Sequence, residues 1–253
     1  MLVHPSGITI GLDEETHIYS DSEGNSDYVS STVLVHKFFP EFEEEKIAGF
    51  VAKKRGCYIQ DVLDEWAENR DESCRFGTLI HRYAECRLMD IPVDVKIESE
   101  KEVLYCKYID DFIPQLQERY SLIGCEEKIF SPDLKISGTI DLLMKDEKNN
   151  KICIFDWKTS KEIKEYGYRG ETGLDFFDDV PHCNFYHYAI QLSIYKNILL
   201  REKYYENVDF ILGLFWINET GVKLFNLPNM DKYVNYIFKN LPVEKKIEIP
   251  SLF

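Results

Sequence analysis

The sequence predicts an α/β protein with a mixed central β-sheet flanked by helices, and three features of the chain predict this fold class. Alternating apolar residues mark three consecutive strands at residues 122–130, 135–145 and 151–157. A long helix follows at residues 184–203, and more strand follows the helix. A strand that comes after a crossover helix can lie parallel to an earlier strand. We therefore expect a sheet that contains both antiparallel and parallel pairs.

The beginning of the chain is expected to hold a small hairpin and then helices. Short alternating segments at residues 7–10 and 17–20, with a polar turn region at 21–27, predict the hairpin. Apolar residues at helical spacing between residues 41 and 70 predict two helices joined near Arg55-Gly56. These elements are expected to decorate the sheet and not to belong to it.

Two more helices are expected before the strands. The third should cover residues 71–89, and the fourth should cover residues 102–120, where Pro114 is expected to kink or divide it. The segment 161–181 has no clear period and is expected to be a lid or a connection. The remaining expected elements are strands at residues 210–217 and 222–225 and a last helix at residues 230–240.

The composition is that of an ordinary packed protein. The 253 residues are 44% hydrophobic and carry 30 Lys and Arg against 45 Asp and Glu, a net charge of −15. This balance excludes a basic coat for nucleic acid. No apolar run approaches the roughly 18 residues of a membrane span, and the N-terminus lacks the features of a signal peptide. We expect a cytoplasmic, intracellular protein that is not secreted and has no membrane partner.

The seven cysteines are scattered singly along the chain, and no two of them form a C-x-x-C pair. An odd and unclustered set indicates reduced thiols, several of which are small core side chains. We therefore expect neither a cysteine-ligated zinc ion nor an iron–sulfur cluster.

Candidate chemistry lies in the predicted strands. Asp141 is an acid within an otherwise apolar strand, and Asp156 and Lys158 project from one face of the next strand, about 6.6 Å apart. Two carboxylates beside a lysine can hold Mg²⁺ or Mn²⁺ next to a phosphodiester, with the lysine orienting or deprotonating the attacking water. A surface ion pair at a strand end is the alternative for Asp156 and Lys158.

Five short motifs follow one another in the order found in a known family. With their positions here, they are G-x-x-x-H (Gly77 to His81), a strand acid (Glu126 or Glu127), G-x-x-D (Gly138 to Asp141), D-x-K (Asp156 to Lys158) and Q-x-x-x-Y (Gln191 to Tyr195). In this the chain resembles the PD-(D/E)XK nuclease superfamily, and within it the RecB-type exonucleases, which include phage-encoded and mitochondrial genome maintenance exonucleases. The segment from His17 through Thr32 to Trp66 resembles the leader of phage-type members.

The resemblance implies a restriction-endonuclease-like core in a single domain. Residues 1–253 would form that domain, with a hairpin and helical decoration at 1–70, the nuclease core at 71–225 and a C-terminal helix and tail at 226–253. The implied ligands of Mg²⁺ or Mn²⁺ are Asp141, Asp156, the backbone carbonyl of Trp157, Glu126 and His81. Lys158 would position water or stabilise charge on the phosphate. Spacing in similar proteins favours Glu126 over Glu127, which lies on the opposite strand face.

Three of the motif residues have alternative structural roles. His81, on a helix, is either a packing residue or a ligand, and Gly77 would let that helix approach the sheet. Gln191 and Tyr195 share a helix face. The resemblance implies that this pair contacts DNA or orients the lysine, and the alternative is a polar edge on an amphipathic helix.

An acidic protein needs local basic clusters to hold DNA. Residues 145–164 contain six lysines against four acids. Lys161 is expected to contact the DNA backbone together with the neutral hydroxyls of Thr159 and Ser160. The aromatic stretch at residues 166–177 is expected either to stack on unpaired bases or to cap the core.

The sequence thus favours a metal-dependent DNA exonuclease that acts on single-stranded or free DNA ends in recombination, repair or replication. A structure-specific endonuclease on the same core, a non-catalytic nucleic-acid-binding subunit and an acidic mimic of DNA are the alternatives. The chain carries no G-x-x-x-x-G-K-[ST] motif, so any helicase or recombination partner is expected to be a separate protein.

Overall fold

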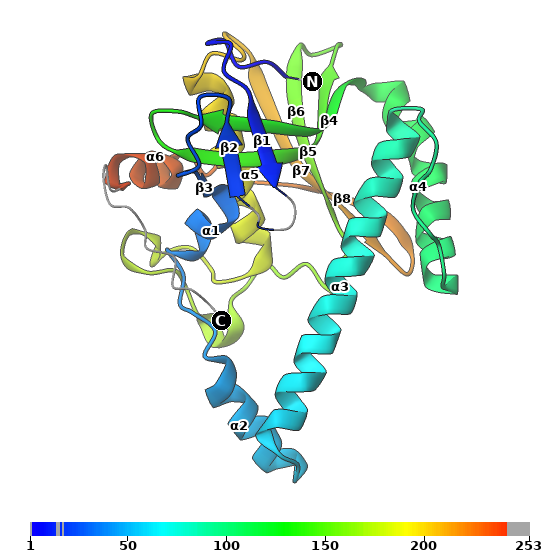
Figure 1. Ribbon diagram of the computed structural model, residues 1–253, viewed down its shortest axis with the longest axis vertical. Coiled ribbons are helices and arrows are strands. Elements are labelled where there is room, and N and C mark those ends of the chain that lie inside the picture. Colours follow the sequence, from blue (N-terminus) through cyan, green and yellow to red (C-terminus); the bar gives the residue numbers. More distant parts are fainter. Residues whose placement is uncertain (1, 14–15, 17, 242–253) are drawn as a thin grey trace.

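The computed structural model describes residues 2–13, 16 and 18–241 and has the expected mixed α/β fold (Figure 1). A six-stranded sheet has the strand order β3-β5-β6-β7-β8, and β4 pairs with β5 outside that path. Parallel pairing joins β6 to β7 and β3 to β5, whereas the other neighbours are antiparallel. The strands are β3 (Val29–Ser30), β4 (Ser121–Ser131), β5 (Ile136–Asp146), β6 (Lys151–Lys158), β7 (Asp209–Asn218) and β8 (Gly221–Asn226).

Strands β5 and β6 pair along only part of their length. Their register runs from Asp146 opposite Lys151 to Leu142 opposite Phe155 and stops there. Strand β6 continues beside β7 as far as Lys158, while β5 turns away from it toward β3. The sheet therefore opens just beyond Leu142, and the backbone beyond this point faces a gap between two strands.

The N-terminal hairpin forms a separate two-stranded sheet of β1 (Ile10–Asp13) and β2 (Ile18–Asp21). Both strands begin later than predicted, and His17 lies outside the described residues. Strand β3 and helix α1 (Ser31–His36) were not predicted. The side chain of Ser30 caps α1 by accepting a hydrogen bond from the Val33 amide.

Helices α2 (Glu44–Arg55) and α3 (Ile59–Leu88) meet at Gly56, as predicted, where a left-handed conformation ends α2. The prediction of a separate helix starting at residue 71 is wrong, because α3 is a single helix of 30 residues. No glycine or proline interrupts its polar middle, so nothing ends the helix there. Its first half extends away from the sheet and packs against α2 (Figure 1).

Helix α4 (Glu100–Arg119) is one helix, so Pro114 does not divide it. Proline removes one intrahelical hydrogen bond. The buried side chains of Ile113 and Leu116 on either side of Pro114 pack into the core and hold the helix together. No helix among the described residues is long and apolar enough to cross a membrane.

The helices cover the two faces of the sheet. Helix α5 (Asn184–Arg201) packs between α1 and α6 (Asp231–Asn240), and their side chains share a core with Ile140, Leu143 and Ile154. Helices α3 and α4 form a second core with side chains of the opposite sheet face, Leu142, Met144, Phe155 and Trp157. The predicted C-terminal helix is thus found, whereas residues 242–253 of the predicted tail lie outside the described part.

Candidate active site

Asp141 and Asp156 lie where β5 and β6 separate. Asp141 is the first residue of β5 beyond the last pair with β6, and it stays tied to β6 through its side chain. The backbone amide of Trp157 donates a hydrogen bond of 3.0 Å to Asp141 Oδ2. This hydrogen bond fixes the position of the Asp141 carboxylate at the point where the two strands stop pairing.

His81 reaches this opening from α3. Its Nε2 lies 2.9 Å from the carbonyl oxygen of Trp157 and donates a hydrogen bond to it, because a carbonyl can only accept. The other ring nitrogen, Nδ1, lies 3.3 Å from Asp141 Oδ2 and 4.0 Å from Glu126 Oε1. Nδ1 thus points toward two acids of the site, so the ring can serve as a ligand as well as a packing residue.

Glu126, and not Glu127, is the acid of β4 that faces this opening. In the β4–β5 register, Cys125 is opposite Leu142 and Glu127 is opposite Ile140, so Glu126 lies level with Asp141. Glu126 has a φ of 51°, a left-handed conformation that is rare for a residue other than glycine. Glu127 is buried, and its carboxylate accepts a hydrogen bond from the Leu2 amide.

Burial and neighbouring charge raise the pKa values of two acids of the site, Glu126 and Asp156. Burial, followed by the charges of Asp141 and Glu85, raises the pKa of Glu126 to about 8. Burial and the Asp141 charge raise the pKa of Asp156 to about 6, although Lys158 opposes this shift. Acids held together in this way are stabilised in their charged form by a cation.

The three side chains of His81, Glu126 and Asp141 each place one potential ligand atom within 4.8 Å of the others. Two carboxylates and an imidazole fit a divalent cation such as Mn²⁺, and the carboxylates also suit Mg²⁺. The other two implied ligands are engaged differently here: Asp156 pairs with Lys158, and the Trp157 carbonyl accepts the bond from His81. Both lie next to the cluster of three.

Lys158 is held as a cation. Its Nζ lies 2.5 Å from Asp156 Oδ2 and 4.8 Å from the centre of the Tyr188 ring. Burial alone lowers the pKa of a lysine, but the neighbouring charges of Asp156 and Asp141 outweigh this and raise the pKa of Lys158. An ammonium group has no lone pair to accept a proton. The geometry therefore supports charge stabilisation by Lys158 and not removal of a proton from water.

Gln191 and Tyr195 hold α5 against β5 and α1. Gln191 Nε2 donates to the Tyr195 hydroxyl at 2.9 Å and to Thr32 Oγ1 at 3.0 Å. The Tyr195 ring lies against Gly138, three residues before Asp141, where a side chain on residue 138 would overlap it. Tyr195 is only 4% exposed, so the predicted contact of this residue with DNA is not supported. Its place under β5 suits a role in positioning Asp141.

The residues after Lys158 lie at the edge of the site. Lys161 is exposed, whereas Thr159 and Ser160 are half-buried, and the Ser160 carbonyl accepts a hydrogen bond from the Trp216 indole. The role expected for Gly77 is not found. A Cβ at Gly77 would lie 3.8 Å from Thr159 Oγ1, an ordinary contact, so alanine also fits there.

The segment 161–181 divides into two parts. Phe177 is fully buried and Phe176 stacks on Tyr236 at 4.3 Å, so this half caps the core. Tyr166 and Tyr168, which are each 68% exposed, leave two aromatic rings open to solvent on the side of the segment nearer Lys158 in the chain. The core-capping expectation therefore holds for Phe176 and Phe177, whereas stacking of Tyr166 and Tyr168 on bases stays a prediction.

Two residues of the site were not predicted. Glu85 lies one helical turn after His81 and adds a negative charge near Glu126, and Tyr188 packs on Lys158. Tyr188 precedes Gln191 by three residues and therefore lies on the same helix face. The i, i+3 and i+7 spacing of Tyr188, Gln191 and Tyr195 is the signal that predicts this shared face.

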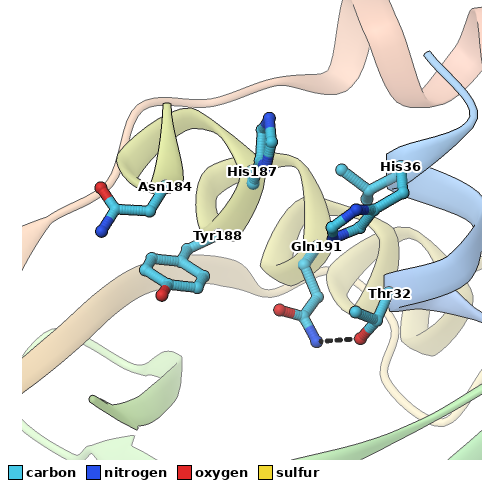
Figure 2. Close-up of a pocket in the computed structure, with 7 residues that line it drawn as sticks. Thr32, His36, Asn184, His187, Tyr188 and Gln191 are labelled. Carbon is cyan, nitrogen blue, oxygen red and sulfur yellow. Dashed lines mark hydrogen bonds between the residues drawn. The ribbon is translucent and has the colours of Figure 1, made fainter. Parts of the chain in front are cut away.

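A pocket of about 230 Å³ opens beside the site, between α1 and α5 (Figure 2). Tyr188 and Gln191 line it, and Tyr188 connects it to the site because its ring centre lies 4.8 Å from Lys158 Nζ. Its other side chains include His187 on α5 and His36 on α1.

Comparison with protein-family models and with curated proteins finds no match for this chain. The mixed sheet with helices on both faces establishes an α/β fold. Any assignment of function therefore depends on the chemistry of the site between β5 and β6.

Proposed function

We propose that this chain is a metal-dependent deoxyribonuclease of the PD-(D/E)XK type that hydrolyses phosphodiester bonds at DNA ends. One observation carries the proposal. A cluster of His81, Glu126 and Asp141 lies at the point where β5 and β6 separate, beside an Asp156–Lys158 pair. Acidic side chains that can hold a divalent cation next to a fixed ammonium group can together promote cleavage of a phosphodiester.

The carboxylates of Asp141 and Glu126 and the imidazole of His81 would hold Mg²⁺ or Mn²⁺. When bound, such an ion supplies Lewis acidity and lowers the pKa of a coordinated water. The chain contributes a fixed geometry, because the Trp157 amide orients Asp141 and the Trp157 carbonyl orients His81. Hydrogen bonds between the backbone and the ligand side chains keep those ligands in place during the reaction.

Lys158 would stabilise the negative charge that develops on the phosphate. Asp156 holds its ammonium group at 2.5 Å, and the Tyr188 ring limits its movement. A charge that is already in place needs no reorganisation when the reaction occurs, which is the main source of electrostatic catalysis. The proton of the attacking water would pass to solvent or to a carboxylate of the site, because Lys158 is already protonated.

DNA ends are the proposed substrate because the basic and aromatic groups near the site are few and local. Lys161, Tyr166 and Tyr168 are exposed after the end of β6 and suit a short stretch of single strand. A net charge of −15 opposes long contact with duplex DNA. We further propose that the protein works inside the cell in recombination, repair or replication, and that any helicase is a separate partner.

The test is degradation of oligonucleotides labelled at the 5′ or the 3′ end, single- or double-stranded, with Mg²⁺, Mn²⁺ or EDTA. The variants Asp141→Asn and Lys158→Ala should abolish metal-dependent release of label. Lys107→Ala, which removes an exposed lysine paired with Asp111 on α4, is the matched control and should keep full activity. Degradation that survives both site substitutions would refute the proposal, and cleavage of a circular single strand would indicate an endonuclease instead.

A further inference from the structure

The pocket between α1 and α5 has the chemistry of a site for a neutral, planar ring. The lining residues are Thr32, Val35, His36, Asn184, His187, Tyr188 and Gln191. The set includes aromatic rings, two side-chain amides and two hydroxyl-bearing side chains but no carboxylate, lysine or arginine. The metal-ligand cluster a short distance away consists of two acids and a histidine. A phosphate would find no cation in this pocket, whereas a nucleobase carries no charge and offers donors and acceptors at its edges.

A polar group in the pocket is available to a ligand. Among the residues that the structure describes, Gln191 makes its hydrogen bonds through Nε2, to Thr32 and Tyr195, so its Oε1 is left to accept a bond. His187 Nε2 is buried and has no hydrogen-bond partner among the described residues. Burial, followed by the nearby rings of His182 and His36, lowers the pKa of His187 to about 4, so this ring is neutral at neutral pH. The ring already packs against Phe39 at 4.1 Å and stacks on His182 at 5.1 Å, so His187 gives the pocket a neutral aromatic wall and does not itself bond the ligand.

The pocket also lies at the right place for a base of the substrate. Tyr188 lines the pocket and its ring centre is 4.8 Å from Lys158 Nζ. Gln191 lines it as well and is bonded to Tyr195, which lies against β5 near Asp141. A nucleotide whose phosphate lay beside Lys158 would have its base within reach of the pocket, since base and phosphate are joined by a single sugar.

We infer that this pocket receives the base of the nucleotide next to the phosphodiester that is cleaved, turned out of the stack of the DNA strand. The inference depends on the proposed nuclease function and adds to it a contact with one unpaired base. Such a base must be free of its partner strand, so the pocket would favour single-stranded or frayed ends. Base turning of this kind costs least where the base is already unpaired.

The test uses single-stranded oligonucleotides in which one nucleotide at a time is replaced by an abasic analogue that keeps the sugar and phosphate. Binding is measured by fluorescence anisotropy with the Lys158→Ala protein, which should not degrade the probe, and cleavage is measured with the wild type. Loss of the one base that enters the pocket should weaken binding about 5- to 150-fold, the range for one stacked base. Removal of other bases should have smaller effects.

Protein variants then assign the effect to the pocket. His36→Ala removes an exposed ring from the α1 side and should weaken binding of the intact oligonucleotide. Thr32→Trp should fill the pocket, and it should abolish the difference between the intact and abasic probes. Circular dichroism melting of each variant shows whether the fold is kept.

The outcomes separate the two proposals. Metal-dependent cleavage and binding that are equal for intact and abasic probes would overturn the base pocket and leave the nuclease proposal standing. A position-specific loss that persists in Thr32→Trp would also overturn it, because the base would then be bound elsewhere. No metal-dependent cleavage of any unmodified oligonucleotide would overturn the nuclease proposal and, with it, this inference.

Discussion

Gly138→Ala tests the packing that supports the site without any assumption about function. A methyl group on residue 138 would lie 3.0 Å from Tyr195 Cζ and closer still to Cε1. The ring cannot move aside easily, because it is buried and Gln191 donates a hydrogen bond to its hydroxyl. Either the ring or strand β5 must therefore shift.

The expected loss of stability is the difference between two opposing effects on the free energy of unfolding. Replacing glycine by alanine inside a strand normally stabilises a protein by about 0.5–1 kcal/mol through chain entropy. Overpacking of a filled core costs about 1–3 kcal/mol, and the contact at Gly138 is shorter than van der Waals distance. We expect the free energy of unfolding to fall by about 1–2 kcal/mol.

The assay is urea unfolding followed by circular dichroism, with Gly77→Ala as the matched control. A methyl group at Gly77 meets only Thr159 Oγ1 at 3.8 Å, so this helical substitution should stabilise by about 0.5–1 kcal/mol. A Gly138→Ala protein as stable as the wild type would refute the packing argument. So would equal losses in both variants, which would point to a general effect of replacing glycine.

The remaining predictions concern charge at the site. Lys158→Arg should lower cleavage about 100- to 1000-fold, measured as label release, because the larger planar guanidinium would pair with Asp156 in another geometry and move the positive charge away from the phosphate. Wild-type rates in this variant would contradict the role of Lys158. Mn²⁺ should raise the melting temperature of the wild type but not of Asp141→Asn, and equal shifts would place the ion elsewhere. The pKa of Glu126 is about 8 in the folded protein against 4.5 ordinarily, so the folded state keeps a proton that the unfolded chain releases in this window. In EDTA, the free energy of unfolding should therefore fall as pH rises from about 4.5 to 8. The full shift corresponds to about 5 kcal/mol, and because 35% of the side chain is exposed, we expect about 1–2 kcal/mol. Urea unfolding across this window should show the slope in the wild type and a flatter curve in Glu126→Gln, and identical curves would refute the assignment.

Local patterns in the sequence determined the strands of the central sheet. The predicted strands at residues 122–130, 135–145 and 151–157 differ from β4, β5 and β6 by at most one residue at each end. Helices cover both faces of the sheet, so these strands are largely apolar, and a run of apolar residues between polar turns is a local signal that marks each of them. The same holds for α5, whose predicted start at residue 184 is the observed one.

Elements that depend on distant partners could not be predicted in this way. Strand β3 has two residues and exists because it pairs with Ile136 and Ser137 of β5, more than a hundred residues later in the chain. Helix α3 was divided in the prediction because its polar middle lacks a buried face. In the structure α3 continues through this polar middle. The helix needs no buried face against the sheet there, because its first half extends beyond the sheet.

For the candidate site, the sequence by itself determined which residue types lie on which strand, and the tertiary structure decided which of them meet. Alternation places Glu126 and Glu127 on opposite faces but does not say which face holds the site. The left-handed backbone conformation of Glu126 and the separation of β5 from β6 determine that Glu126 is the acid at the site. Glu85, Tyr188 and Thr32 come from three different helices. Their approach to the site is decided by helix packing, which brings together side chains that no local pattern in the chain connects.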